Sequence, residues 1–526
     1  MTDRYALISV SDKTDIEKVA EALIQSGLTL LSTGGTLKAL EEANIPVLAV
    51  ETVTEFPEMM DGRVKTLHPK IHGGLLGVRK NEEHKKAMSD HGIVPIDVVV
   101  VNLYPFKETI QHPNTSLLDA IENIDIGGPS MLRSAAKNYQ SVTVVTDPRD
   151  YPLLIEQLTN NNETTLQFRQ YLAKKVFQLT AYYDSLIAEY LTQQFDNIEA
   201  EKSNDWPHIT LTYEHSQSLR YGENSHQAAD FYTKLDAPEY SLANAVQLHG
   251  KELSYNNIKD ANAALQIIGE FPEPCAVAVK HLNPCGVAIG STIEQAFNHC
   301  FEADPISIFG GIVVLNRPVT LALAEKLHDI FLEIVIAPSF EEDAFQLLAK
   351  KKNIRLMTVH FSEKDNRPEM EYASVSGGLL VQNVDCSSEL TNPSEWETMT
   401  ELVPTEKEKQ ALSFGMRVCK HVKSNAIVIS NEYRTLGIGS GQMNRVGAAK
   451  IALEQAKNAT KDMKDSLLIM ASDAFFPMDD TVKLAHEYGV SSIIQPAGSL
   501  KDKDSIAACN ELGMSMVKTG IRHFKH

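Results

Sequence analysis

Tyr5-Ala6-Leu7-Ile8-Ser9-Val10 is a short apolar run followed at once by the polar turn Ser11-Asp12-Lys13-Thr14. Apolar residues then recur at helical spacing from Ile16 to Ile24, and Gly27 ends the pattern. A second apolar run, residues 28–31, breaks at a turn with two glycines, Ser32-Thr33-Gly34-Gly35-Thr36, before another helical pattern. Strands and helices that alternate in this way predict a doubly wound α/β domain with a parallel sheet.

The same alternation continues to a domain boundary. Further strands are predicted at residues 47–50, 98–101 and 142–145, and a helical pattern runs from 163 to 194. The segment after this helix is polar and poor in apolar residues, which is typical of a linker. The sequence therefore predicts a first domain over residues 1–196, a linker over 197–207 and a second domain over 208–526.

The second domain is also predicted to be α/β, because apolar runs again alternate with helical patterns. A polar stretch near residues 386–405 divides it into two lobes of similar size. Both lobes place a strand before an Asp-containing turn with aromatic residues. The match is too loose to establish a duplication from the sequence.

Composition and charge exclude several classes of protein. The 526 residues exceed what one hydrophobic core serves, and 43% hydrophobic content supports a folded chain. A net charge of -20 argues against general binding to nucleic acid or anionic membrane. Six scattered cysteines without a C-x-x-C pair indicate reduced thiols. We identify no signal peptide and no bilayer-spanning apolar stretch, and therefore expect a protein of the cytosol.

One apolar run ends on two neighbouring cationizable side chains. Residues 275–279 predict a buried strand, and Lys280 and His281 follow it directly. We expect both to point into a cleft, where burial would lower their pKa values. A neutral imidazole beside a fixed positive charge suits removal of a proton from an amine while an oxyanion develops nearby. A solvated strand end is the alternative.

The polar turns of the first domain predict a phosphate site. Ser11 and Lys13 follow the first strand, while Thr33, Gly35 and Thr36 lie where the second strand meets a helix. Glycines let backbone N–H groups approach a ligand, and a helix N-terminus favours negative charge. An ordinary glycine turn is the alternative. The segment that contains Arg63, Lys65 and Thr66 adds two cations and a hydroxyl, which we interpret as a phosphate clamp.

Acid and base groups follow in the same domain. Tyr104 comes after the strand at 98–101, and Asp125 precedes a helix that carries Lys137. With Lys65 these side chains supply an acid, a base and oxyanion partners without a metal. Asp125 could equally be a helix cap. His68 and His72 are not predicted to bind a metal, because Pro69 disfavours a helix through both and no third ligand is in register.

Polar segments of the second domain are less specific. They comprise the loop from Leu219 to Gln227, the glycines from Gly437 to Gly441 and the terminal run from Arg522 to His526. Solvated surface and a frayed chain end explain the first and last equally well. The glycines lack the spacing of a dinucleotide fingerprint. Asn283-Pro284-Cys285-Gly286 lacks the second cysteine and the H-x-E of a zinc deaminase.

Taken together, the motifs resemble one family from end to end. The first half is similar to the cyclohydrolase half of bifunctional purine biosynthesis proteins at Val10-Ser11-Asp12-Lys13, residues 32–36, residues 62–69, Asn102-Leu103-Tyr104-Pro105-Phe106 and residues 124–128. The second half resembles their transformylase half at residues 219–227, Lys280-His281-Leu282-Asn283-Pro284, residues 303–305, residues 472–477, residues 494–496 and residues 522–524.

The resemblance implies two consecutive reactions. A formyl group passes from 10-formyltetrahydrofolate to 5-aminoimidazole-4-carboxamide ribonucleotide (AICAR), and the formamido product (FAICAR) closes to IMP with loss of water. It implies a methylglyoxal-synthase-like first domain, a transformylase region of two deaminase-like lobes without zinc, and a homodimer with transformylase sites between subunits. Whether a monovalent cation supports the nucleotide site is left open.

The resemblance also implies roles for single residues. His281 accepts the amine proton and Lys280 stabilises the oxyanion or assists proton transfer, with their division of labour left open. Lys65, Tyr104, Asp125 and Lys137 are implied to be the catalytic residues of ring closure. The nucleotide and folate contacts implied are Ser11, Lys13, Thr33, Gly35, Thr36, Arg63, Thr66, Arg220, Tyr221, Asn283, Phe309, Gly311, Glu333, Asn425, Arg445, Phe475, Asp480, Arg522 and Phe524.

The chain departs from the family pattern at two positions. Ser225 stands where proline is common, and Glu333 stands where aspartate is also found. Neither change removes a proposed catalytic group. Two rival hypotheses are a nucleotide sensor without catalysis and a formyltransferase with an inactive first domain.

Overall fold

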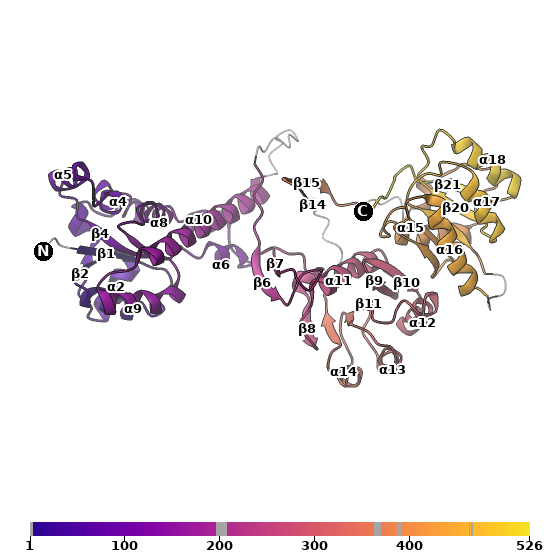
Figure 1. Ribbon diagram of the computed structural model, residues 1–526, viewed down its shortest axis with the longest axis horizontal. Helices are drawn as coiled ribbons and strands as arrows, with labels where there is room; N and C mark the ends of the chain where they lie inside the picture. The colour runs from indigo at the N-terminus through magenta and orange to yellow at the C-terminus, as the bar shows by residue number, and fades with distance from the viewer. Residues whose placement is uncertain (1–3, 196–207, 362–369, 387–391, 462, 464–465) are drawn as a thin grey trace. The chain divides into compact units, whose positions relative to one another are not determined.

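The computed structural model describes residues 4–195, 208–361, 370–386, 392–461, 463 and 466–526. The chain divides into two compact units, Met1–Thr212 and Tyr213–His526 (Figure 1). The predicted linker, residues 197–207, lies outside the described residues. The described helices include none whose length and hydropathy would let it cross a lipid bilayer.

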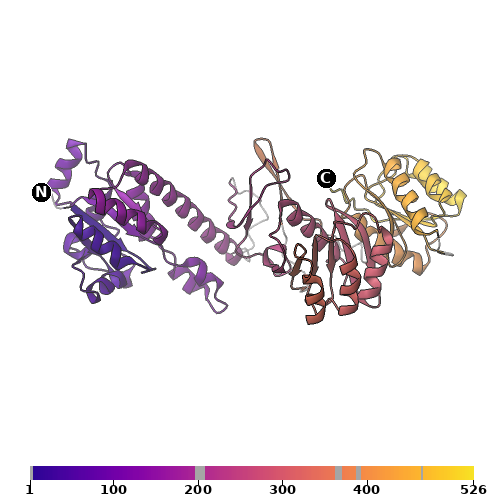
Figure 2. The ribbon, with the colours of Figure 1, turned by 60° about the horizontal axis from the view of Figure 1, so that its bottom comes forward.

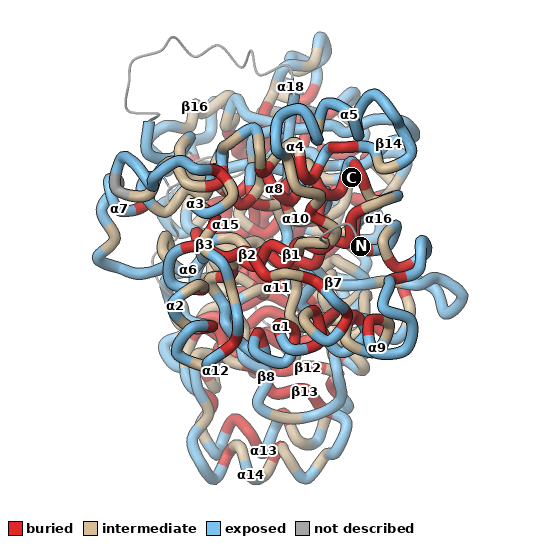
Figure 3. The backbone as a smooth tube through the Cα atoms, turned by 90° about the vertical axis from the view of Figure 1, so that its left-hand side faces the viewer, coloured by how far each residue is buried: buried red, intermediate tan, exposed pale blue. Residues whose placement is uncertain are grey.

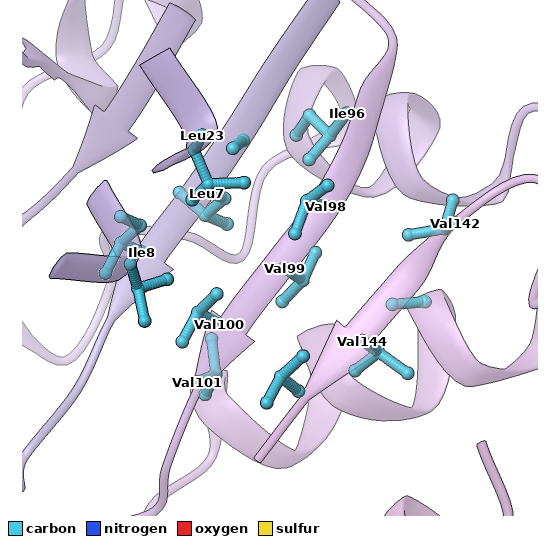
Figure 4. Close-up of a cluster of buried hydrophobic side chains, with 14 of the residues drawn as sticks. Leu7, Ile8, Leu23, Ile96, Val98, Val99, Val100, Val101, Val142 and Val144 are labelled. Atoms are coloured by element: carbon cyan, nitrogen blue, oxygen red, sulfur yellow. The ribbon is translucent and has the colours of Figure 1, made fainter. Parts of the chain in front are cut away.

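The first unit contains a five-stranded sheet in the order β3-β2-β1-β4-β5. Its strands are β1 (Arg4–Ser9), β2 (Leu28–Ser32), β3 (Leu48–Ala49), β4 (Ile96–Val101) and β5 (Thr143–Val145). All four strand pairs are parallel, so the predicted parallel sheet is confirmed. The valines of β4 lie between Leu7 and Ile8 of β1 on one side and Val144 of β5 on the other (Figure 4). Parallel strands covered on both faces have this continuous apolar sequence.

Helices cover the sheet of the first unit. They are α1 (Ile16–Gln25), α2 (Gly34–Glu42), α3 (Val50–Thr54), α4 (Pro69–Leu76), α5 (Glu82–Asp90), α6 (Phe106–Gln111), α7 (Leu117–Glu122), α8 (Gly127–Lys137), α9 (Tyr151–Asn161) and α10 (Leu166–Phe195), with 3-10 turns at Met60–Gly62 and Pro148–Asp150. Helix α1 packs against α9, and α8 contacts α4 and α10. The order places the loops after β1, β2 and β4 at one edge of the sheet, where α/β proteins bind ligands.

The second unit contains two six-stranded sheets. The first lobe has the order β10-β9-β11-β12-β13-β8. Its elements are β8 (Val246–His249), α11 (Tyr255–Ile268), β9 (Cys275–Lys280), β10 (Asn283–Ile289), α12 (Ile293–Ala303), β11 (Ile312–Leu315), α13 (Leu321–Asp329), β12 (Ile334–Ala337), α14 (Glu342–Ala349) and β13 (Arg355–Thr358). A turned view shows these helices packed along the strands (Figure 2).

The second lobe has the order β16-β21-β20-β19-β17-β18. Its elements are β16 (Glu397–Thr398), α15 (Glu406–Cys419), β17 (Ile427–Ser430), β18 (Thr435–Gly439), α16 (Arg445–Ala459), β19 (Ile469–Ser472), α17 (Asp480–Glu487), β20 (Ser492–Gln495), α18 (Asp502–Leu512) and β21 (Ser515–Lys518). In both sheets the strand that follows the first helix pairs antiparallel with its two neighbours, and the next two pairs are parallel.

The two lobes are therefore two copies of one fold. Each begins with an edge strand and a helix, and each then alternates strands and helices in the same spatial order. The sequence match alone was too loose to establish this duplication, because the shared feature is the order of elements and not the residues. The remaining elements are the hairpins β6 (Glu214–Leu219) with β7 (Ala229–Thr233) and β14 (Met370–Val375) with β15 (Gly378–Asn383), and 3-10 turns at Leu242–Asn244 and Pro393–Glu395.

The lobes meet at the edge strands β10 and β18. Ile289 donates its N–H to the carbonyl of Tyr433 at 2.8 Å, and Val287 donates its N–H to Thr435 Oγ1 at 3.1 Å. A buried polar cluster adds to this contact, because Glu270 Oε1 lies 3.0 Å from His421 Nε2 and 3.4 Å from Lys420 Nζ. Burial lowers the pKa of His421 to about 4. The central strands of the three large sheets and the helix residues that pack on them are buried (Figure 3).

Candidate functional site

Two lysines of the first unit lie over the N-terminus of α2. A Cβ atom added at Gly34 would lie 3.5 Å from Lys65 Nζ, and one added at Gly35 would lie 3.9 Å from Lys13 Nζ. Gly34 has a φ of 55°, which favours glycine. The first N–H groups of a helix and two ammonium groups together form a site for a phosphate. The structure thus brings Lys13, Lys65 and the glycine turn together.

Asn102 fixes the loop after β1 in this site. Its Oδ1 accepts hydrogen bonds from Ser11 N at 2.6 Å, Ser11 Oγ at 2.8 Å and Asp12 N at 3.0 Å. Thr36 Oγ1 lies 2.9 Å from both the N and the O of Val10. The hydroxyls of Ser11 and Thr36 are therefore held by the protein itself. Thr33 Oγ1 is buried and makes no hydrogen bond to the described residues. Sequence reasoning gave Asn102 no role, although it follows β4 directly.

Asp125 lies at the N-terminus of α8 among backbone N–H groups. Its Oδ1 accepts from Gly128 N at 2.8 Å, and its carboxylate also accepts from the N–H groups of Tyr104 and Gly127. Burial raises the pKa of Asp125 above its ordinary value, and these hydrogen bonds oppose the rise. A carboxylate that protonates more easily than usual suits proton transfer.

The segment with Arg63, Lys65 and Thr66 connects the two helix N-termini. A Cβ atom added at Gly127 would lie 2.9 Å from Thr66 Oγ1, while Lys65 reaches the turn before α2. Lys65 also forms an ion pair with Glu58 at 2.9 Å, and Arg63 pairs with Glu122. The structure therefore brings Thr66 near the start of α8, beside Asp125, and Lys65 near the turn before α2. Tyr104 is 52% exposed beside them.

Lys137 does not join this group within one chain. It ends α8, whereas Asp125 precedes the first residue of that helix. At 1.5 Å per residue, the two ends of α8 are about 15 Å apart. Lys137 instead lines an open pocket of about 630 Å³ with Arg133, Lys174, Phe177 and other residues of α8 and α10.

Lys280 and His281 lie at the turn between β9 and β10. Residues His281 and Leu282 have φ values of 54° and 66°, an unusual conformation for residues with a Cβ. The carboxylate of Asp260 on α11 holds this turn, because it accepts from His281 N at 3.2 Å and from Leu282 N at 2.8 Å. Sequence reasoning missed Asp260, which lies in a separate helix.

The expectation that both side chains are buried is wrong. His281 is exposed and Lys280 is only partly buried, because the hairpin turn projects them beyond the end of the sheet. Lys280 Nζ donates a hydrogen bond to the carbonyl of Phe309 at 2.7 Å. Glu333 lies at the same edge, where its N–H donates to the carbonyl of Gly311 at 3.0 Å and its carboxylate binds Arg355.

The β9–β10 turn meets the second lobe through Asn283. Its Oδ1 accepts from Lys423 N at 3.1 Å, next to Asn425. Arg445 Nη2 donates to Asn425 Oδ1 at 2.8 Å. A pocket of about 400 Å³ is lined by Ser424, Asn425, Gly441, Gln442, Met443, Phe524 and His526. The structure therefore brings Asn283, Asn425, Arg445 and Phe524 together.

The other predicted contacts lie on nearby loops. Arg220 stacks on Tyr221 with 4.9 Å from its Cζ to the ring centroid, and the neighbouring Glu223 binds Lys259, which precedes Asp260 on α11. Arg522 stacks on Phe524 with 4.4 Å from its Cζ to the ring centroid. Phe475 follows β19 and is 38% exposed, and Asp480 begins α17. The side chain of Asp480 accepts a hydrogen bond from Thr481 N at 2.7 Å, within its own helix.

The described residues contain no cluster of three or more His, Cys, Asp or Glu side chains that could hold a metal ion. The two groups of side chains are both rich in cations, and one lies in each unit. An α/β chain with a cationic group at the sheet edge of each unit suits the class of enzymes that act on phosphorylated small molecules.

Comparison with known proteins identifies the family. The model of the AICARFT/IMPCHase bienzyme family matches residues 135–455, and the MGS-like domain model matches residues 15–130. Proteins named bifunctional purine biosynthesis protein PurH are similar over the full length. The Enterococcus faecalis protein is 56% identical over 100% of both chains, and the Listeria innocua protein is 58% identical over 99% of this chain and 100% of its own.

The chain belongs to the AICARFT/IMPCHase bienzyme family. It is a bifunctional enzyme of purine biosynthesis with formyltransferase and cyclohydrolase activities. The predicted family, its methylglyoxal-synthase-like first domain and its two activities are thereby confirmed.

The first prediction concerns Asp260. Asp260→Ala removes the acceptor of two turn N–H groups, so the position of His281 is lost and the formyl-transfer kcat falls about 100-fold, as expected for a small misplacement of a reacting group. Asp260→Asn keeps one acceptor and retains more activity. Steady-state kinetics of both variants measure the effect. Wild-type kcat in folded Asp260→Ala would contradict the assigned role.

The second prediction concerns Asp125. Because its pKa is raised in the folded protein, the native state binds more protons than the unfolded state above pH 3.8, the ordinary value. Ionised Asp125 therefore costs stability, and that cost grows as the pH rises to the folded pKa. Asp125→Asn should abolish ring closure and raise the thermal stability of the first unit, most at neutral pH and least near pH 4. Unfolding followed at several pH values checks this, and an equal gain at all pH values would refute it.

Proposed function

We propose that the second unit transfers a formyl group from 10-formyltetrahydrofolate to AICAR and that the first unit closes FAICAR to IMP. In residue terms, the cyclohydrolase domain spans 1–196 and the transformylase domain spans 208–526, divided near 386–405. The observation that carries this proposal is the pair of separate cationic groups, one in each unit. Family membership supports the two reactions.

In the second unit, the nucleotide binds across the Asn425 and Phe524 pocket. Its amine then lies near the projecting β9–β10 turn. The amine nitrogen attacks the formyl carbon, His281 takes the amine proton, and the positive charge of Lys280 stabilises the oxyanion. The bond from the formyl carbon to the folate nitrogen then breaks, and that nitrogen receives the proton. The exposed Phe309 and Phe331, whose ring centroids are 5.1 Å apart, offer an apolar surface to the folate.

In the first unit, the nucleotide phosphate binds at the N-terminus of α2 between Lys13 and Lys65. The carboxamide lies towards Asp125, whose carboxylate takes a proton from the amide nitrogen as it attacks the formamido carbon. Lys65 and Tyr104 stabilise the formyl oxygen, which receives the proton taken by Asp125 and then a second proton from the formamido nitrogen. The carbon–oxygen bond breaks, water leaves, and a double bond forms between that carbon and the formamido nitrogen. The raised pKa of Asp125 supports its part in this transfer.

We further propose a homodimer in which one subunit supplies Lys137 to the ring-closure site of the other. The separation along α8 supports this, because Lys137 cannot meet Asp125 within one chain without a rearrangement of that helix. The open pocket around Lys137, Arg133 and Lys174 presents three cations. A nucleotide held by a second copy would complete it.

The setting of the enzyme is also a proposal. All six cysteines are free, which supports a reducing compartment such as the cytosol. The net charge of -20 opposes binding to nucleic acid or anionic membrane. A monovalent cation beside the nucleotide site stays a hypothesis that follows from the resemblance alone.

The third prediction separates the two sites. The purified chain should convert AICAR and 10-formyltetrahydrofolate to IMP and tetrahydrofolate. His281→Ala abolishes formyl transfer but still closes supplied FAICAR, whereas Lys137→Ala does the reverse. Chromatography of FAICAR and IMP gives both rates. Loss of both activities in each folded variant would overturn the assignment, and a wild-type chain that forms neither product would favour the sensor.

The fourth prediction tests the shared site. Lys65→Ala and Lys137→Ala should each be inactive in ring closure when assayed alone. When the two variants are refolded together or coexpressed, the mixture should regain about a quarter of wild-type activity. Half of the dimers are then mixed, and each mixed dimer holds one intact site and one inactive site. A mixture of Lys65→Ala and Asp125→Asn is the matched control. Both residues belong to the same half-site, so this mixture should regain no ring-closure activity. Equal recovery in both mixtures would exclude the proposal.

A further inference from the structure

In each lobe, the residue that directly follows the fourth strand of the six-stranded sheet in chain order, β11 or β19, is buried and polar. It is Asn316 in the first lobe and Asp473 in the second, 7% and 0% exposed. Asn316 donates its backbone N–H to the carbonyl of Cys275 at 3.3 Å, and Asp473 donates its N–H to the carbonyl of Ala426 at 3.4 Å. The two residues therefore occupy the same position in the duplicated fold.

The side chain of Asn316 both accepts and donates structural hydrogen bonds, which requires a neutral amide. Its Oδ1 accepts from Cys275 N at 2.8 Å, and its Nδ2 donates to the carbonyls of Phe271 and Glu273 at 2.9 and 2.7 Å. These bonds fix the approach of the chain to β9. A carboxylate could not replace this side chain, because it accepts hydrogen bonds but does not donate them.

Asp473 binds a different set of groups. Its Oδ1 accepts from Arg445 Nη1 and its Oδ2 accepts from the hydroxyl of Ser424. A buried charge needs a partner of opposite sign, and the guanidinium of Arg445, itself 6% exposed, provides it.

The bonds of Asp473 reach three segments of the nucleotide pocket. Arg445 extends its other nitrogen, Nη2, to Asn425, and Ser424 precedes Asn425 in the chain. The backbone carbonyl of Asp473 accepts from His523 N at 3.0 Å, next to Phe524. Asp473 is thus the buried centre to which the residues 424–425, Arg445 and the segment before Phe524 are attached.

We propose that Asp473 is a positioning residue for the nucleotide in formyl transfer, and that this acid distinguishes the nucleotide-binding lobe from its duplicate. The inference rests on the proposed function, which places AICAR in the Asn425 and Phe524 pocket. Asp473 has no exposed surface, so it acts through Arg445 and Ser424 and not by touching the ligand.

Asp473→Asn in the full-length protein tests the proposal, because it installs the side chain that the first lobe carries. The KM for AICAR should rise about tenfold or more, consistent with the loss of a charge-assisted hydrogen bond in a buried network. The kcat should change less. Ring closure of supplied FAICAR by the first unit should stay at the wild-type rate, which shows that the protein is folded and active.

A double-mutant cycle separates positioning from general damage. In an Arg445→Met background, Asp473→Asn should add little further rise in KM, since its partner is already absent. Asn316→Ser is the matched control in the first lobe and should lower the unfolding temperature while the KM for AICAR stays within about twofold, because that site serves packing alone. If Asp473→Asn does not fold, Ser424→Ala removes one donor without a change in charge and should still raise the KM.

The results that would overturn the inference are distinct from those that would overturn the function. A folded Asp473→Asn with wild-type KM, or an Asn316→Ser variant with the same rise in KM, would remove the special role of Asp473. Absence of formyl transfer in the wild-type chain would remove the proposed function instead.

Discussion

In this chain, carboxylates that accept hydrogen bonds hold the loops of each proposed site in place. Asp125 accepts N–H groups from the start of α8 and from Tyr104, and Asp260 accepts the two N–H groups of the β9–β10 turn. Asp473 accepts from Arg445 and Ser424 in the second lobe. An ionised carboxylate accepts several bonds at once, and charge makes each bond stronger than a neutral one. These acids allow irregular loops to hold catalytic side chains at the ends of regular sheets.

Duplication explains how the second unit could acquire a site without a new fold. The lobes share one order of elements, yet each contributes different segments to the proposed site. The first lobe contributes the turn with Lys280, His281 and Asn283. The second contributes the loop before β17 and the start of α16. Since the lobes join along edge strands, these two surfaces meet at a fixed register.

The sequence predicted the elements better than their contacts. Apolar runs and helical spacing were sufficient to predict the parallel sheet, because they are local signals. The order of the motifs was sufficient to predict the family, because many motifs add up to one specific signal. The exposure of His281 was not predicted, because the sequence does not show that β10 pairs back on β9 at once and leaves His281 in the tight turn between them. Asp260 and Asn102 were missed as positioning residues because their partners lie far away in sequence. The separation of Lys137 from Asp125 follows from the length of α8. The sequence did not predict it, because the pattern does not show where that helix ends.

The two ammonium groups above α2 have a consequence for how the first unit behaves in different buffers. Lys13 and Lys65 carry like charges at the end of one helix dipole, and they repel each other. A doubly charged anion between them would relieve that repulsion, so inorganic phosphate and sulfate are expected to compete with a nucleotide at the proposed site. Ligands that bind the folded state raise its stability in proportion to the logarithm of their concentration. The thermal stability of this unit therefore depends on the anions in the buffer as well as on the polypeptide.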